Sequence, residues 1–337
     1  MDRLYAISGV TGMTGNELVR QILTNKNSKD HIVGFDNFYA SSIDTVKDCL
    51  DDERFEFFEF DLNNEENMRS FEHTICSIKD NYDSVVYINC AAVVHTEHFY
   101  EIYETFDTNV TGMKQFMEQA IRVGAEIYIN CSTSEVYSMN SWNDEGGVRE
   151  DSFLTLADAE HSQRTSYAVG KLLTEFFMKD AVDKKKIRGC SIRFANVYSK
   201  DERYPKHIIP FIINSLMEKG KVVLLENSIK NRRTFLNNYD SCSAVLALVN
   251  SSEALDGSVY NVATDEEIKI TDLVELCAEK MGIENPEISF EGYRESDPER
   301  RILSTEKIRK RTSWQPIVTL EKGIEECVAG YTAEKKL

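Results

Sequence analysis

Several features that are common in other classes of protein are missing from this chain of 337 residues. Acidic residues outnumber basic ones by 57 to 39, so the formal net charge is -18 and no broad basic surface is expected for nucleic acid. No apolar run has the length of a transmembrane helix, and no charged-then-apolar signal peptide precedes the first apolar segment. We therefore expect a cytoplasmic protein with neither a nucleic-acid nor a membrane partner.

Motifs for metal binding and for disulfides are also lacking. The eight cysteines include no Cys-x-x-Cys pair, and Cys90 and Cys131 lie inside apolar, strand-like runs. Buried thiols in a reducing compartment fit this pattern better than disulfides or zinc. His95 and His98 have no cluster of further ligands near them in the sequence. We predict that the protein holds no metal.

Short apolar runs alternate with helical patterns in the first half of the chain. The runs are at residues 31–35, 55–60, 84–89, 126–130 and 189–194. Amphipathic segments around 99–123 and 163–182 are long enough to be crossover helices. This alternation predicts an α/β fold with a Rossmann-type, doubly wound parallel sheet. We expect residues 1–200 to form the cofactor-binding domain and 201–337 to form mainly a smaller α/β substrate-binding lobe, with some segments returning to the first domain.

Three glycines lie between an apolar strand and an amphipathic helix near the start of the chain. Gly9, Gly12 and Gly15 have the spacing Gly-x-x-Gly-x-x-Gly, with Thr11 and Met13 between them. Such a turn lets the backbone approach a pyrophosphate, whose charge meets the unpaired N–H groups at the helix N-terminus. We predict that these five residues bind a dinucleotide.

The end of the second predicted strand indicates which dinucleotide binds. Asp36 lies about twenty residues past the glycine turn, where a carboxylate accepts hydrogen bonds from the ribose and repels a 2′-phosphate. No Lys or Arg occurs in residues 37–46, so we predict NAD rather than NADP. Asp61 either lies beside the adenine or caps a loop. Further cofactor contacts are predicted from Asn37, Leu62, Ala91 and Ala92.

A second motif in the middle of the chain carries acid–base chemistry. Tyr167 and Lys171 are four residues apart and share a helix face, where an ammonium stabilises a phenolate. The phenolate can take a hydroxyl proton while hydride leaves the same carbon. Thr133 and Glu135 follow the fifth predicted strand, at the carboxyl edge where such sheets bind ligands. We predict that these four residues are catalytic.

Taken in order, these motifs resemble the extended short-chain dehydrogenases/reductases of the NAD-dependent epimerase/dehydratase family, which modifies nucleotide sugars. The resemblance covers nearly the whole chain and includes Asn109-Val110-Thr111-Gly112. It implies that Asn109, Tyr167 and Lys171 contact NAD. It implies that Asn196, Arg233 and Arg301 contact a nucleotide-diphosphate sugar. It also implies a homodimer formed through the helices near 99–123 and 163–182.

The resemblance further implies a shared first step, in which C4 of the sugar is oxidised to a ketone with Tyr167 as the base. Ser134-Glu135 resembles the Ser-Glu of GDP-mannose dehydratases and UDP-glucuronate decarboxylases, whereas thymidine-diphosphate-glucose dehydratases carry Asp-Glu. In a dehydratase, Glu135 is placed to remove the C5 proton. In a decarboxylase, Ser134, Glu135 and Arg301 surround the departing carboxylate. Gln163-Arg164 also resembles the decarboxylases.

We therefore predict a lyase, either a 4,6-dehydratase or a uronate decarboxylase. The alternative is a nucleotide-sugar 4-epimerase, which needs only to return hydride to the other face of the keto sugar. A non-catalytic NAD-binding sensor is the third possibility. Such sensors usually lose the Tyr or the Lys, whereas this chain retains Thr133, Tyr167 and Lys171 together.

Overall fold

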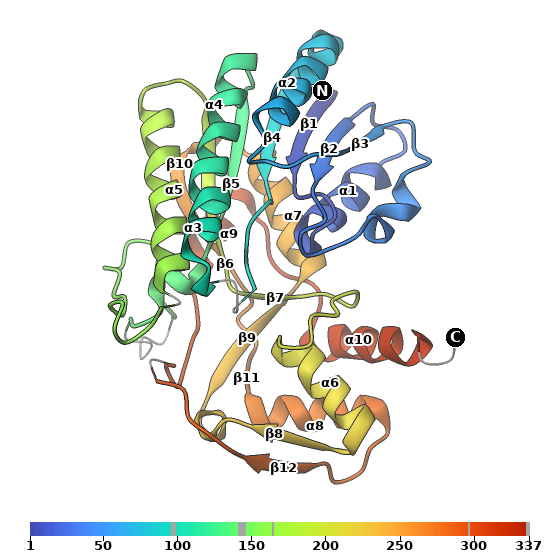
Figure 1. Cartoon of the computed structure of the whole chain (residues 1–337), viewed down its shortest axis with the longest axis vertical. Coiled ribbons are helices and arrows are strands. Elements are labelled where there is room, and N and C mark those ends of the chain that lie inside the picture. Colours follow the sequence, from blue (N-terminus) through green and yellow to red (C-terminus); the bar gives the residue numbers. More distant parts are fainter. Residues whose placement is uncertain (96–98, 141–145, 164, 296, 335–337) are drawn as a thin grey trace.

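Seven strands, all parallel, form the central sheet of the protein (Figure 1). The structure is a computed structural model that describes residues 1–337 apart from 96–98, 141–145, 164, 296 and 335–337, so His98 and Arg164 lie outside the described residues. In order across the sheet, the strands are β10 (Asp256–Val262), β6 (Arg188–Phe194), β5 (Ile127–Thr133), β4 (Ser84–Asn89), β1 (Arg3–Ser8), β2 (His31–Asp36) and β3 (Phe55–Glu59).

Helices cover both faces of this sheet because its central strands carry buried apolar side chains on both sides. In β1, Tyr5 and Ile7 pack into one core, whereas Leu4 and Ala6 pack into the other. The first core includes α1 (Met13–Thr24), α7 (Asn238–Val249) and α9 (Glu306–Thr312), and the second includes α2 (Glu65–Ile78), α4 (Met113–Val123) and α5 (Thr165–Asp183). The predicted doubly wound α/β fold is confirmed.

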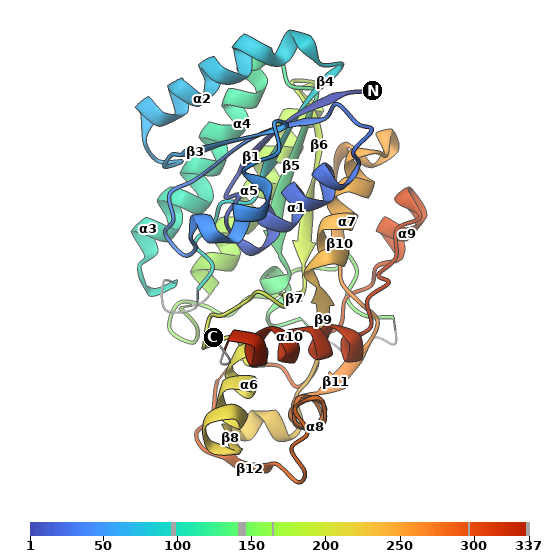
Figure 2. The same ribbon diagram turned by 90° about the vertical axis from the view of Figure 1, so that its right-hand side faces the viewer.

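A smaller lobe lies beyond the carboxyl ends of the sheet strands (Figures 1 and 2). Its strands are β7 (Asn196–Tyr198), β9 (Arg232–Asn237) and β11 (Glu267–Lys269), with the separate parallel pair β8 (Lys221–Leu224) and β12 (Glu287–Phe290). Its helices are α6 (Ile208–Lys219), α8 (Ile270–Met281) and α10 (Leu320–Glu334). Buried apolar side chains of these elements form a third core. The chain returns to the sheet twice after residue 201, through α7 and through β10 and α9.

The helical segment after β4 is not uniform. It begins as α3 (Ile102–Phe106), widens into the π-helical turn η4 (Asp107–Gly112) and continues as α4. π turns are uncommon and often occur at functional sites. In the described part of the chain, no helix is long and apolar enough to cross a membrane.

Candidate active site

A cavity of about 960 Å³ lies where the sheet strands end and the smaller lobe begins. Ligands of doubly wound sheets bind at this edge. The lining includes fourteen of the residues predicted from the sequence, namely Gly9, Thr11, Gly12, Met13, Gly15, Asp36, Asn37, Asp61, Leu62, Ala91, Ala92, Thr133, Tyr167 and Lys171. The two predicted motifs, far apart in the sequence, therefore meet at one cavity.

The glycine turn is shaped for close approach to a ligand. Gly9 has φ +72°, and a Cβ there would lie 2.6 Å from the backbone nitrogen of Ala91. A Cβ at Gly15 would lie 2.1 Å from the Gly9 carbonyl oxygen, so both positions require glycine. A Cβ at Gly12 would contact only the Gly9 oxygen, at 3.3 Å. Gly12 is also the N-cap of α1 and provides no side-chain cap, so the first N–H groups of this 12-residue helix are left for a ligand.

Asp36 connects this turn to the loop that follows β2. One oxygen of its carboxylate accepts a hydrogen bond from the Thr11 backbone N–H at 3.2 Å, and the other accepts one from the Phe38 N–H at 2.9 Å. Asn37 donates from its side-chain amide to Asp61, at 3.1 Å. These bonds hold the carboxylates of Asp36 and Asp61 at one end of the cavity. Each carboxylate oxygen has a second lone pair for a ribose hydroxyl.

Asn109 lies outside the cavity and contacts its wall from behind. Its side chain, in the π turn η4, accepts a hydrogen bond from the Val93 N–H at 2.7 Å and donates one to the Val93 oxygen at 2.9 Å. Asn109 is 1% exposed, whereas Ala91, Ala92 and Val93 line the cavity. The amide therefore fixes the loop after β4, and its direct contact with a cofactor stays a prediction.

The acid–base residues come together from two elements. Lys171, in α5, is buried, and its Nζ donates to the carbonyl oxygen of Cys131 in β5 at 3.0 Å. This burial lowers the pKa of Lys171. The ring of Tyr167, one turn earlier, stacks on Phe99 with a centroid distance of 4.5 Å. Thr133, the last residue of β5, lines the same cavity and accepts a hydrogen bond from the Glu135 N–H.

A buried polar network behind these residues was not predicted from the sequence. Glu175 lies one further turn along α5 and accepts hydrogen bonds from the Ser132 hydroxyl at 2.6 Å and from two nitrogens of Arg193. Arg193 also donates to the hydroxyl of Tyr137, which donates to Asn261 at 3.0 Å. The four-residue spacing of Tyr167, Lys171 and Glu175 was the sequence pattern that could have indicated Glu175. The network ties α5 to the ends of β5, β6 and β10.

A separate cluster at the lobe contains Glu135, which was predicted to be catalytic, and Arg233 and Arg301, which were predicted to contact the sugar. Glu135 and Arg301 form an ion pair at 2.5 Å, and their side chains are 18% and 14% exposed. Arg233 pairs with Asp297 at 2.8 Å, and burial lowers the pKa of its guanidinium, which also experiences the charges of Arg301 and Glu135. None of the three lines the large cavity. This cluster therefore lies apart from Thr133, Tyr167 and Lys171, which line the large cavity.

Two further predicted residues lie next to that cluster. Asn196 donates from its side-chain amide to the Thr234 oxygen at 3.1 Å, joining β7 to β9. Ser134 is the first residue of the short turn η5 (Ser134–Tyr137), between Thr133 and Glu135. Among the described residues, no group of three or more His, Cys, Asp and Glu side chains is arranged to hold a metal ion.

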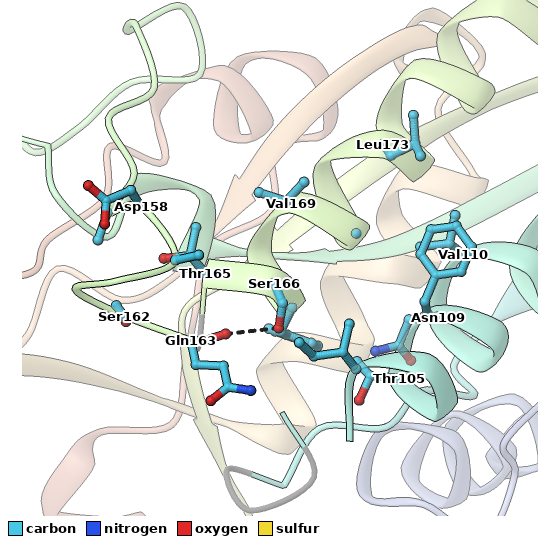
Figure 3. Close-up of a pocket in the computed structure, with 16 residues that line it drawn as sticks. Thr105, Asn109, Val110, Asp158, Ser162, Gln163, Thr165, Ser166, Val169 and Leu173 are labelled. Carbon is cyan, nitrogen blue, oxygen red and sulfur yellow. Dashed lines mark hydrogen bonds between the residues drawn. The ribbon is translucent and has the colours of Figure 1, made fainter. Parts of the chain in front are cut away.

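A second, smaller cavity of about 440 Å³ lies beside α3, η4 and the start of α5 (Figure 3). Thr105, Asn109 and Val110 line it on one side and Ser166, Val169 and Leu173 on the other. Tyr167 borders both cavities. The apolar wall of the smaller cavity includes Val169 and Leu173 of α5, whose side chains are also exposed on the surface.

Known proteins resemble this chain over most of its length. Residues 6–327 match the model of a family described as GDP-mannose 4,6 dehydratase. The dTDP-D-glucose 4,6-dehydratase of Mus musculus is 28% identical over 254 residues, which are 73% of this chain and 67% of that protein. The UDP-glucuronic acid decarboxylase 5 of Arabidopsis thaliana is 24% identical over 338 residues, covering 94% of this chain and 86% of that protein.

The fold also has a close match among solved structures. DesIV, a dTDP-glucose 4,6-dehydratase from Streptomyces venezuelae with NAD and TYD bound, superposes with a TM-score of 0.83. The superposition covers 99% of this chain and 98% of that one, at 20% sequence identity. At this identity, the likeness establishes the shared fold.

Proposed function

The chain belongs to the GDP-mannose 4,6-dehydratase family of NAD-dependent epimerases and dehydratases, and on this premise we propose that it is a nucleotide-sugar lyase acting through a 4-keto intermediate. Thr133, Tyr167 and Lys171 lie at the cavity that also contains the glycine turn, and this observation carries the proposal. The proposed substrate is a nucleotide-diphosphate sugar. Water or carbon dioxide is the leaving group.

The cofactor is NAD, and the residues of the cavity fit it. Gly12 leaves space where a Cβ would stand, next to the uncapped start of α1, and this cradle suits a pyrophosphate. Asp36, Asn37 and Asp61 would hold the adenosine end, and Ala91 and Ala92 would allow close approach at the other end. NAD, when bound, accepts the hydride from C4 of the sugar.

The first step uses Tyr167 as the base that removes the proton of the C4 hydroxyl. The buried ammonium of Lys171 stabilises the phenolate by its charge, and the Cys131 carbonyl holds that ammonium in place. The hydroxyl of Thr133 shares the sugar hydroxyl with Tyr167. Oxidation at C4 makes the C5 proton acidic, or makes a uronate into a β-keto acid.

The second step involves Glu135. Its ion pair with Arg301 stabilises the carboxylate form, which is the form of a general base. In a dehydration, Glu135 takes the C5 proton as the C6 hydroxyl leaves. In a decarboxylation, Arg301 and Ser134 surround the carboxylate that leaves as carbon dioxide. Both reactions depend on the same first step.

The experiment is mass spectrometry of a panel of nucleotide sugars incubated with the protein and NAD in deuterated water. Loss of water with uptake of deuterium would identify a dehydratase, and loss of carbon dioxide a decarboxylase, together with the substrate. A new isomer of unchanged composition would identify a 4-epimerase and overturn the lyase proposal. No turnover with a sample that binds NAD would favour a sensor.

We also propose a homodimer. Val169, Leu173 and Phe176 lie along one exposed side of α5 at helical spacing and are 49%, 38% and 64% exposed. Phe106 of α3 lines the smaller cavity together with Val169 and Leu173 and extends this set, and we call the four residues the apolar stripe. An apolar surface of this kind marks an interaction site, and a second copy of the chain would cover it.

We also propose a cytoplasmic location, because a reducing compartment suits the eight free thiols.

A further inference from the structure

Two cysteines occupy level positions at the carboxyl ends of neighbouring strands. β4 and β5 pair in parallel with Asn89 opposite Asn130. Cys90 directly follows Asn89 at the end of β4 and Cys131 follows Asn130 within β5, so this register puts the two cysteines side by side. Neighbouring strands are about 4.7–4.9 Å apart. This separation falls in the range of about 4.4–6.8 Å that disulfides span between Cα atoms.

Both thiols belong to the large cavity. Cys90 and Cys131 are free and partly exposed, and each lines the cavity beside Lys171. Five of the other six cysteines are buried, and Cys76 is exposed on α2. Cys90 and Cys131 are therefore the two thiols that a small reagent entering this cavity can reach.

The surroundings give the two sulfurs different reactivities. A hydrogen bond from the Cys90 thiol and the nearby charge of Lys171 lower the pKa of Cys131. The same hydrogen bond raises the pKa of Cys90. A thiolate is the reactive form toward oxidants. Cys131 therefore has the character of the attacking sulfur, and Cys90 that of the resolving sulfur.

We propose that Cys90 and Cys131 form a reversible oxidation site, at which a hydroperoxide converts the two thiols into a disulfide inside the cavity. The Cys131 thiolate attacks the peroxide oxygen, which gives a sulfenic acid and releases an alcohol or water. The Cys90 sulfur then attacks the sulfenic sulfur, so that the S–S bond forms, the S–O bond breaks and one water leaves. Two thiols are oxidised by two electrons and one peroxide is reduced.

The consequence for the cavity follows from the neighbours of each sulfur. The disulfide would link the end of β4 covalently to β5, next to Ala91 and Thr133. It would also hold the Cys131 carbonyl, which accepts the hydrogen bond from Lys171. Loss of activity on oxidation rests on the proposed function, whereas the disulfide itself does not.

The test is peptide mapping of the whole protein after exposure to hydrogen peroxide. Trypsin separates the three relevant cysteines, since residues 70–79, 80–114 and 123–149 each contain one, Cys76, Cys90 and Cys131 respectively. We expect a linked pair of the 80–114 and 123–149 peptides, two hydrogens lighter than their sum, that dithiothreitol separates. Cys76 should alkylate fully as the internal control. Full alkylation of Cys90 and Cys131 after peroxide, or a link to any other cysteine, would overturn the proposal.

Single variants assign the two sulfurs. In Cys90→Ser, the attacking Cys131 should accumulate a sulfenic acid that dimedone traps, whereas in Cys131→Ser, Cys90 should give no dimedone adduct. Phenylarsine oxide, which bridges close thiol pairs, should bind the wild type at one equivalent and both variants more weakly by about tenfold or more, a difference of about 1.4 kcal/mol. Cys76→Ser is the matched control and should behave like the wild type. Equal arsenical binding by wild type and variants would contradict the pairing. Because these readouts are covalent or binding measurements, they are independent of turnover.

Discussion

At the scale of single residues, Tyr167 and Lys171 share a helix face but differ in environment. Tyr167 borders both cavities and stacks on Phe99, whereas Lys171 lines only the large cavity and is 2% exposed, with the Cys131 carbonyl as its hydrogen-bond partner. We expect Tyr167 to touch the substrate and Lys171 to act on the Tyr167 phenol through its charge.

Replacement of Tyr167 by Phe removes one oxygen from the site. If this oxygen is the base, kcat should fall by about 100-fold or more, the range in which general bases contribute. The matched control is Tyr103→Phe, at a position that is 88% exposed, and it should keep the wild-type rate. Steady-state kinetics with the substrate found in the panel would measure both. A Tyr167→Phe variant with normal kcat would assign the base elsewhere.

Burial of Lys171 also predicts how stability depends on pH. Because burial lowers its pKa in the folded protein, the unfolded chain binds more protons from that lowered pKa up to the ordinary value of about 10.4. Stability from this group therefore rises with pH across that window. Lys171→Met lacks the group. The unfolding free energy of the wild type, relative to this variant, should increase as the pH rises toward the ordinary lysine pKa of about 10.4, as urea titrations can measure. A difference that is independent of pH would contradict the effect.

At the scale of elements, the turn between β1 and α1 positions the cavity. Gly9 adopts positive φ directly beside the loop that follows β4, so two strand ends meet there at backbone contact distance. The π turn η4 supports that loop from the other side through Asn109 and Val93. A regular α-helical turn in place of η4 would not put the Asn109 amide on the loop after β4 and α4 on the sheet at the same time.

Gly9→Ala tests the close approach at this turn. Gly9 and Gly124 have nearly equal φ, +72° and +77°, but a Cβ at Gly124 has nothing within 4 Å. Gly124→Ala should cost only the strain of positive φ, about 1–2 kcal/mol. Gly9→Ala adds a clash at 2.6 Å with Ala91 and should lose more stability and weaken NAD binding. Urea denaturation and calorimetric titration compare the two. Equal losses would show that the backbone yields at Gly9.

At the scale of the whole molecule, the two lobes share one chain that crosses between them repeatedly. β10 completes the sheet after the chain has already built β7, β8 and β9 in the smaller lobe. Asp240 of α7 adds a link, because its carboxylate accepts hydrogen bonds from the N–H groups of Ile317 and Val318 just before α10. These connections hold the two lobes together on either side of the large cavity.

The apolar stripe predicts how copies of the chain associate. Phe176→Glu places a charge in the middle of the proposed interface, where an unpaired charge is costly to bury. We expect the wild type to elute as a dimer and the variant as a monomer in size exclusion with light scattering. Ile317→Glu, at a position that is 69% exposed before α10, is the matched control and should remain dimeric. A monomeric wild type would refute the dimer.

The sequence by itself determined the alternating strands and helices, the glycine turn and the four-residue spacing of Tyr167 and Lys171. These features are local, and the rule that ligands bind at the carboxyl ends of parallel strands was enough to predict that they meet. The prediction of the α/β fold rests on the same local periodicity, and the parallel sheet of the structure confirms it.

Only the tertiary structure decided the contacts between distant segments. The ion pair of Glu135 and Arg301 joins residues 166 apart, and the pairing of Glu175 with Arg193 depends on how α5 lies across β6. The side-by-side position of Cys90 and Cys131 requires the order of the strands in the sheet, which the chain order does not give. Hydrophobic periodicity fixes which face of an element is buried, whereas side-chain packing between elements fixes which residues meet.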